Sequence, residues 1–254
     1  MKDIDPRQEN GYSLKSMSSK DLEKIVLTRT DDWKFDEHVS VIFDTHVKRS
    51  IPCYSQIQEL IGIMSKTLLS DNSLVYDLGT ATGNIIRSIH NENEKKNIKY
   101  IGLDKSLPMI RKAKAKCSNI KNATFYNDEV ESFNFQAVDL VVAAFTLQFI
   151  APKKRQSLVQ KIYNRLKPRG HFILCEKITF ERPDEQEFYM NVHESWKQNH
   201  FTKEEINTKK ERLKNVLLPF SLGKNLELLN NAGFIHTNVF FKWSNFVCIL
   251  ASKY

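Results

Sequence analysis

The stretch VYDLGTATGNII, residues 75–86, contains the features that decide the fold of this chain. An apolar run typical of a buried strand ends at Asp77, and two glycines, Gly79 and Gly83, follow it. An amphipathic segment typical of a helix starts directly after the second glycine. Because glycine has no side chain, a loop of this kind lets backbone amides approach a ligand closely. By itself the pattern predicts either a nucleotide-binding loop or a tight turn between a strand and a helix.

Short apolar strands and amphipathic helices alternate on both sides of this stretch. Such alternation predicts a mostly parallel sheet covered by helices on both faces, which is a doubly wound α/β fold. The expected strands are 73–79, 99–104, 123–127, 138–145 and 171–178, and the expected helices are 54–69, 83–95, 106–117, 153–167 and 222–232.

The pattern changes after residue 180. Residues 184–216 are charged and helical, with a capping-box pattern at Thr202 and Glu205, so we expect a helical lid at about 181–220. The segments FIHTNVFFKW and FVCILASKY, separated only by Ser-Asn, predict an antiparallel hairpin after the lid. Residues 1–30 are polar and weakly patterned, and we expect a flexible arm there, with one short helix near 19–27. Residues 31–254 then form a single domain.

Composition and charge narrow the class of protein. The chain has 254 residues, 41% of them hydrophobic and 27% charged, which is typical of a soluble globular protein. No apolar run approaches the roughly 20 residues that span a membrane, and the polar N-terminus lacks a signal-peptide pattern, so we expect a cytoplasmic protein. The four cysteines are far apart and lack zinc-ligand spacing, so no metal site is expected. The net charge of +8 is spread over several helix-like runs without a nucleic-acid-binding motif, so direct nucleic-acid binding is not expected.

Acidic residues around the glycine loop indicate the type of nucleotide. Asp104 ends the next strand, where a carboxylate can accept hydrogen bonds from both ribose hydroxyls of an adenosine. Nicotinamide-dinucleotide-binding proteins usually show G-x-G-x-x-G, whereas this chain has an acid two residues before the first glycine. The Asp-x-Gly-x-Ala-x-Gly pattern resembles motif I of class I S-adenosylmethionine-dependent methyltransferases, with Ala81 in the position of the middle glycine. That resemblance implies a Rossmann-like seven-stranded sheet, acids for the ammonium and ribose of S-adenosylmethionine, and an adenine-recognising acid within YNDEV.

Within that superfamily, residues 32–252 resemble carboxy-S-adenosyl-L-methionine synthases. The matching stretches include DWKFDEHV (32–39), RSIPCYSQI (49–57), FTLQFI (145–150), KIYNRLKPRG (161–170), CEKITFE (175–181) and NVLLP (215–219). The resemblance implies a homodimer that binds S-adenosylmethionine. It further implies that prephenate serves as carboxyl donor, and that the methyl group becomes a carboxymethyl group used in tRNA wobble-uridine modification.

The resemblance also implies cofactor-binding residues, carried over by matching motif. They are Tyr54, Asp77, Gly79, Thr80, Ala81, Asp104, Lys105, Asp128 or Glu129, Val130 and Ala144. Asp128 and Glu129 are nearly equal candidates for the adenine site, because the register there is uncertain by one residue. Ala144 replaces an asparagine of the family, which removes a hydrogen-bonding amide from the pocket.

Lys210 stands where the family has an arginine that pairs with the added carboxylate of the cofactor. Arginine offers a planar bidentate fork whereas lysine is a point charge, so this change is not conservative. Lys210 and Ala144 therefore favour a methyltransferase acting on a small-molecule acceptor, diverged from the carboxy-S-adenosylmethionine synthases. The alternative is a true synthase in which Lys210 replaces the arginine, and a third hypothesis is a cofactor-binding module without catalysis.

The catalytic candidates are Tyr54, His193 and Lys210. A lone histidine such as His193 is more often a surface or hydrogen-bonded group than a base. Two other aromatic residues of the expected lid, Tyr189 and Trp196, are more often a packing face. Glu176 lies at the end of an expected strand, where it could serve catalysis or a structural ion pair.

Overall fold

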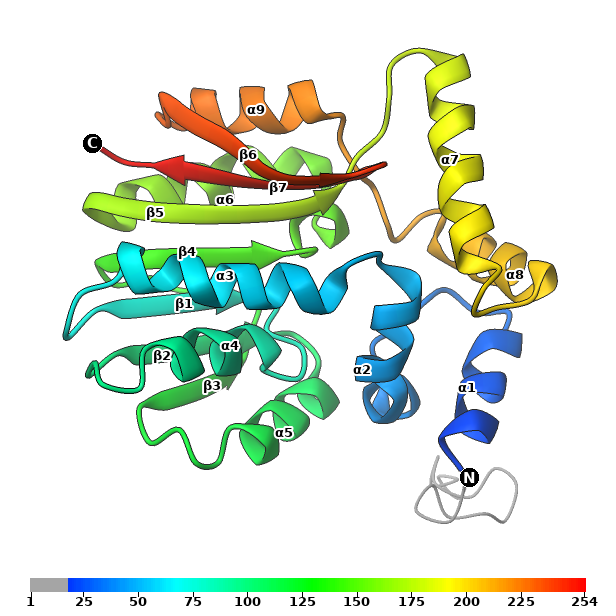
Figure 1. The fold of residues 1–254 in the computed structure, drawn as a ribbon, viewed down its shortest axis with the longest axis horizontal. Coiled ribbons are helices and arrows are strands. Elements are labelled where there is room, and N and C mark those ends of the chain that lie inside the picture. The colour runs from blue at the N-terminus through cyan, green and yellow to red at the C-terminus, as the bar shows by residue number, and fades with distance from the viewer. Residues whose placement is uncertain (1–17) are drawn as a thin grey trace, which may run out of the picture.

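The computed structural model describes residues 18–254. Its centre is a seven-stranded sheet in the order β3-β2-β1-β4-β5-β7-β6 (Figure 1). β1 to β5 pair in parallel, whereas β7 is antiparallel to both β5 and β6. The strands are β1 (Leu74–Leu78), β2 (Lys99–Asp104), β3 (Ala123–Asn127), β4 (Val138–Ala144), β5 (Leu166–Lys177), β6 (His236–Trp243) and β7 (Phe246–Ser252). The predicted doubly wound, mostly parallel sheet with an antiparallel hairpin is confirmed.

Helices cover both faces of this sheet. On one face, Ile61, Ile86 and Ile110 of three helices belong to a single buried cluster with the strands. On the other face, Val159 and Leu229 belong to a second buried cluster. Five helices take part: α3 (Tyr54–Leu68), α4 (Asn84–Glu92) and α5 (Leu107–Lys116) on the first face, and α6 (Pro152–Arg165) and α9 (Leu222–Asn231) on the second.

Two element boundaries differ from the sequence prediction for local reasons. β5 begins at Leu166 rather than 171, because Leu166 pairs with Val138 before the register shifts at a bulge. α4 ends at Glu92 rather than 95, because the side chain of Asn93 turns back and donates to the backbone oxygen of Ile89 (2.8 Å). Both differences lie away from the carboxyl ends of the strands, where the site is expected.

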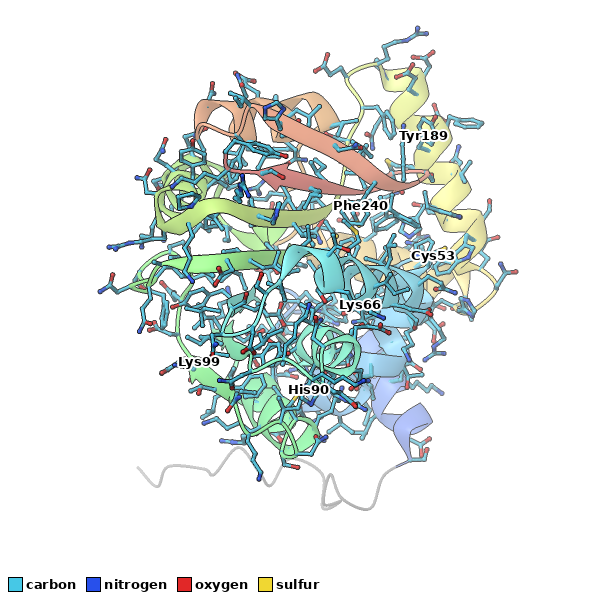
Figure 2. The ribbon with its side chains drawn as sticks, turned by 60° about the vertical axis from the view of Figure 1, so that its left-hand side comes forward. Cys53, Lys66, His90, Lys99, Tyr189 and Phe240 are labelled. Carbon is cyan, nitrogen blue, oxygen red and sulfur yellow. The ribbon has the colours of Figure 1, made fainter. Side chains whose placement is uncertain are left out.

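The lid predicted at about 181–220 contains two helices, α7 (Pro183–Lys197) and α8 (Lys203–Leu213). The predicted capping box is present, since Glu205 N donates to Thr202 Oγ1 (3.2 Å) and Thr202 N donates to Glu205 Oε2 (2.8 Å). In Figure 1 these two helices stand beside the sheet together with two earlier ones, α1 (Ser19–Thr28) and α2 (Glu37–Ser50). In Figure 2, Tyr189 on α7 lies far from Lys99 at the start of β2. The four helices therefore face the carboxyl ends of the parallel strands.

The first described helix, α1, packs against the lid. Within the range expected to form an arm, residues 19–28 are helical, whereas the prediction of a flexible arm over residues 1–17 lies outside the described residues. Leu22 and Val26 are buried in a cluster with Trp33. Arg212 of α8 donates to the backbone oxygens of Val26 (2.5 Å) and Asp31 (2.6 Å). The packed part of the molecule thus includes α1, since its removal would leave the buried guanidinium of Arg212 without its acceptor on Val26.

Candidate active site

The loop after β1 has the conformation that its glycines allow. Gly79, Ala81 and Gly83 have positive φ angles of 69°, 46° and 82°. A Cβ atom at Gly79 would lie 2.5 Å from Thr146 Oγ1, so no larger residue fits at that position. Thr80 N donates to Leu103 O (2.8 Å), which holds the loop against β2. The chain therefore turns sharply at the end of β1 and keeps its backbone exposed to the space beyond the sheet.

Two carboxylates flank this loop. Asp77 accepts from Thr80 Oγ1 (2.6 Å), and Asp104 accepts from Ala81 N (2.9 Å) and Ser106 N (2.8 Å). Burial raises the pKa of Asp77 to about 7 and also raises the pKa of Asp104 above its ordinary value. Neither acid has a salt-bridge partner within residues 18–254. Carboxylates without counter-ions at this place fit the ammonium, sulfonium and ribose hydroxyls of S-adenosylmethionine.

A cavity of about 530 Å³ opens beyond the carboxyl ends of β1, β2, β4 and β5. This is the edge at which doubly wound sheets bind ligands. All the site residues predicted from the sequence line this one cavity: Tyr54, Asp77, Gly79, Thr80, Ala81, Asp104, Lys105, Asp128, Glu129, Val130, Ala144, His193 and Lys210. The fold thus brings them together, while their individual roles stay predictions.

The two candidates for adenine recognition differ in their local bonding. The carboxylate of Asp128 accepts a hydrogen bond from Glu129 N (2.8 Å), so it is engaged with its own loop. The carboxylate of Glu129 accepts no hydrogen bond from the described part of the chain. Val130 beside them is buried and packs under the sheet. This bonding favours Glu129 as the acid that is available to a ligand.

The start of α3 and the end of β4 form apolar parts of the cavity wall. Tyr54 starts α3, and its ring lies 6.0 Å from that of Phe145, centroid to centroid. Burial raises the pKa of the Tyr54 hydroxyl above its ordinary value, so the group stays protonated and can donate a hydrogen bond. Ala144 adds only a methyl group at the end of β4. Tyr54 is therefore suited to orienting a ligand and unsuited to acting as a base near neutral pH.

Five lysines line the lid side of the cavity, and we call four of them, Lys177, Lys197, Lys209 and Lys210, the lysine wall. The fifth, Lys214, lies beside Glu211, with 3.9 Å between its Nζ and Oε2 of that carboxylate. Lys210 donates to Glu194 Oε1 (2.9 Å) and is largely exposed. Burial, with a contribution from neighbouring Lys197, lowers the pKa of Lys177 to about 8. Burial lowers the pKa of Lys209 to about 7. Of these four lysines, only Lys210 was predicted from the sequence as a site residue.

Lys209 belongs to a buried chain of polar contacts that ends at α1. Its ammonium donates to His46 Nε2 (2.5 Å) and to Ser50 Oγ (2.8 Å). The opposite ring nitrogen, Nδ1, therefore carries the proton and donates to Glu23 Oε1 (2.9 Å). Burial lowers the pKa of His46 to about 4, which keeps the ring neutral. The contact with Glu23 fixes the tautomer of His46 and, through it, the place of Lys209 in the wall.

His193 is buried, with its Nε2 3.0 Å from Ser50 O. A ring nitrogen facing a carbonyl oxygen must carry a proton, so this nitrogen donates. Burial lowers the pKa of His193 to about 2, with Lys177 contributing. The ring also lies edge-on to Phe246, with centroids 4.9 Å apart. These contacts favour a role in fastening α7 to α2 over the role of a general base.

The other lid and strand candidates lie in packed surroundings. Tyr189 stacks on Phe180 with 4.2 Å between ring centroids, and Trp196 packs edge-on against Trp243 at 5.9 Å. Glu176 is buried behind the cavity wall and accepts from Leu147 N (3.0 Å). Burial raises the pKa of Glu176 to about 8. The geometry therefore supports the packing interpretation of the two aromatic residues and a structural role for Glu176.

Two kinds of feature are absent from residues 18–254. Within this range, no group of three or more His, Cys, Asp or Glu side chains could hold a metal ion. No helix of the same range is both long and apolar enough to cross a lipid bilayer.

Comparison with known proteins defines the class to which this fold and cavity belong. Residues 75–170 match a family described as "Methyltransferase domain". An O-methyltransferase family protein from Burkholderia thailandensis superposes with a TM-score of 0.62 at 11% identity, covering 92% of this chain and 68% of that one. The YcgJ protein from Bacillus subtilis superposes with a TM-score of 0.55 at 18% identity, covering 72% and 70%. The fold is that of the class I S-adenosylmethionine-dependent methyltransferases.

Relatives in sequence identify the family to which the chain belongs. A carboxy-S-adenosyl-L-methionine synthase from Nautilia profundicola is 36% identical over 87% of this chain and 94% of its own length. Synthases from Helicobacter pylori (37% identical, 86% of this chain and 93% of the relative) and Escherichia coli (34%, 89% and 94%) are similar. The chain belongs to the carboxy-S-adenosyl-L-methionine synthase family. It is an S-adenosylmethionine-dependent transferase, with S-adenosylmethionine as cofactor or substrate.

Proposed function

We propose that the protein is itself a carboxy-S-adenosyl-L-methionine synthase, which carboxylates the methyl group of S-adenosylmethionine. The observation that carries this proposal is the lysine wall. A methyl transfer brings no new anion into the pocket, whereas the synthase forms a carboxylate there and takes its carboxyl group from an anionic donor. The four ammonium groups of the wall outnumber the two carboxylates that line the same side of the cavity, Glu194 and Glu211, and this excess of positive charge suits the second reaction. Following the family resemblance, the donor is prephenate.

Different residues of the cavity would bind different parts of S-adenosylmethionine. Asp104 would accept the ribose hydroxyls, Asp77 would face the ammonium group, and Glu129 would meet the adenine. Bound S-adenosylmethionine supplies a methyl group that is activated by the positive sulfur. Phe145 and Phe246 keep the neighbouring wall apolar, which excludes water and strengthens the charge interactions inside.

Methyl transfer to a small-molecule acceptor is the second candidate, and two observations favour it. The charge of Lys210 is partly neutralised by Glu194, 2.9 Å away, so it attracts an added carboxylate less strongly. Ala144 also offers no hydrogen bond to such a group. We favour the synthase over the methyltransferase, because the lysine wall has three further ammonium groups beside that of Lys210.

Native mass spectrometry of the purified protein, followed by denaturation and identification of the released small molecule, tests the proposal. We expect carboxy-S-adenosylmethionine among the released compounds, and production of this compound when the protein is mixed with S-adenosylmethionine and prephenate. Release of S-adenosylmethionine or S-adenosylhomocysteine alone, with no carboxylated product in the reaction, would support the methyltransferase instead.

Replacing Lys210 by arginine should strengthen binding of carboxy-S-adenosylmethionine by roughly 10-fold, about 1.4 kcal/mol. The planar guanidinium can hold a carboxylate through two parallel hydrogen bonds, whereas an ammonium cannot. Calorimetric titration of wild type and Lys210→Arg measures the difference. Binding of S-adenosylmethionine, which lacks the added carboxylate, is the control and should not change. Equal affinities of the two proteins for the carboxylated compound would contradict this role of position 210.

We also propose that the protein is a homodimer that works in the cytoplasm. It would act on small-molecule substrates and would not bind nucleic acid directly. Light scattering coupled to size-exclusion chromatography measures the mass in solution. A mass of one 29.6 kDa chain at micromolar concentration would contradict the dimer.

A further inference from the structure

Two lysines of the lysine wall are without a bonding partner. Lys177 is the last residue of β5, and its backbone N donates to Gln148 Oε1 (3.0 Å), which fixes the strand end at the cavity. Its ammonium has no hydrogen-bond acceptor or salt bridge within the described range 18–254. The same holds for Lys197 in the last turn of α7. Both residues line the cavity.

The other two lysines of the wall are engaged. Lys209 is bonded to His46 and Ser50, and Lys210 is paired with Glu194. The two remaining ammonium groups are thus one from the sheet and one from the lid, and both line the same cavity. Lys197 lowers the pKa of Lys177, while the carboxylate of Glu194, which is already paired with Lys210, raises the pKa of both. Two like charges held together in a partly buried wall destabilise the protein unless an anion lies between them.

We propose that Lys177 and Lys197 together bind a carboxylate group of the second, small-molecule substrate. The inference rests on the proposed function for one point, that the bound anion is a carboxylate. The presence of two ammonium groups without hydrogen-bond or salt-bridge partners in residues 18–254 does not depend on the proposed function. The site is distinct from the acids for S-adenosylmethionine, because β1 and β4 separate β5 from Asp104 on β2. It lies beside Lys210, whose charge lowers the pKa of both lysines and which is the counterpart of the residue that pairs with the carboxylate on the cofactor.

Such a site would determine specificity as well as affinity. Because Lys177 comes from the sheet and Lys197 from the lid, an anion bound between them would link the lid to the sheet. A neutral substrate would leave both ammonium groups unpaired. The second substrate would therefore be selected for its negative charge before any chemical step takes place.

Calorimetric titration of the full-length protein with malonate, acetate and inorganic phosphate tests the site. We expect malonate to bind wild type, and Lys177→Met and Lys197→Met each to weaken it by about 10-fold. Lys112→Met removes the same charge from an exposed position of α5 and should leave the affinity unchanged. Glu194→Gln should strengthen malonate binding by a few-fold, because it removes the carboxylate that is paired with Lys210 in the wall.

The outcomes separate this inference from the proposed function. Unchanged malonate affinity in both folded lysine variants, or equal losses in Lys112→Met, would overturn the inference. Binding of phosphate at least as tight as that of malonate would overturn the carboxylate assignment. The proposed function is tested separately, by formation of the carboxylated product in wild type. Loss of that product with malonate binding still dependent on Lys177 would refute the function and leave the anion site standing. Circular dichroism confirms that each variant is folded.

Discussion

Replacing Asp104 by alanine is expected to weaken binding of S-adenosylmethionine by on the order of 1–3 kcal/mol, or roughly 5- to 150-fold. The carboxylate has two functions that the change removes together. It would accept the ribose hydroxyls, and it already accepts the backbone N–H groups of Ala81 and Ser106, which hold the glycine loop and the start of α5. Isothermal titration calorimetry with S-adenosylmethionine measures the loss.

Three conservative variants separate the effect of charge from that of hydrogen bonding. Asp104→Asn keeps an oxygen acceptor without the charge, so its affinity should fall between those of wild type and Asp104→Ala. Asp128→Asn and Glu129→Gln test the adenine position in the same way, and we expect the larger loss for Glu129→Gln. Unchanged binding in Asp104→Ala would show that the ribose does not lie at the end of β2.

Replacing Asp77 by asparagine should raise the stability of the ligand-free protein at pH 8 by about 2–4 kcal/mol. The pKa of this carboxyl is raised from 3.8 to about 7 by burial, so the folded state disfavours its ionised form. The folded protein binds this proton more tightly than the unfolded chain, and stability therefore falls as the pH rises from about 4 to about 7. Asparagine has no charge to bury and can still accept from Thr80 Oγ1.

Urea unfolding at pH 4.5 and pH 8 measures this effect. The gain of Asp77→Asn over wild type should be present at pH 8 and largely absent at the lower pH. The same variant should bind S-adenosylmethionine more weakly, because the ammonium group loses its counter-ion. Thr80→Val, which removes the hydroxyl donor and leaves the carboxylate in place, should destabilise the ligand-free protein at pH 8. Equal stability of wild type and Asp77→Asn at pH 8 would contradict the buried, ionised carboxylate.

The sequence was sufficient to predict the sheet and the cavity residues expected to bind S-adenosylmethionine, because both depend on local patterns. The glycine loop and the acids Asp77 and Asp104 come directly after predicted strands, and the carboxyl ends of parallel strands meet at one edge. The antiparallel hairpin could be predicted because only two residues, Ser244 and Asn245, separate its strands.

The lysine wall and its supports could not be predicted, because their residues are distant in the sequence. Lys177 follows a strand, whereas Lys209 lies in a charged helical run whose pattern is that of a solvated face. Only the packing of α8 on α1 and α2 brings Lys209 to His46, and His46 to Glu23. His193 shows the same limit, since a contact with a backbone oxygen of α2 has no sequence signal.

The position of β7 inside the sheet, between β5 and β6, has a consequence for synthesis on the ribosome. β5 is complete at Lys177, but its second edge pairs with residues 246–252, which are translated about 70 residues later. At translation rates of about 5–20 residues per second this interval is roughly 4–14 s. During that time the edge of a long, apolar strand is open to pairing with other chains. Nascent chains of this protein should therefore depend on protection of that edge, by trigger-factor-like chaperones or by the lid helices, until the hairpin has emerged.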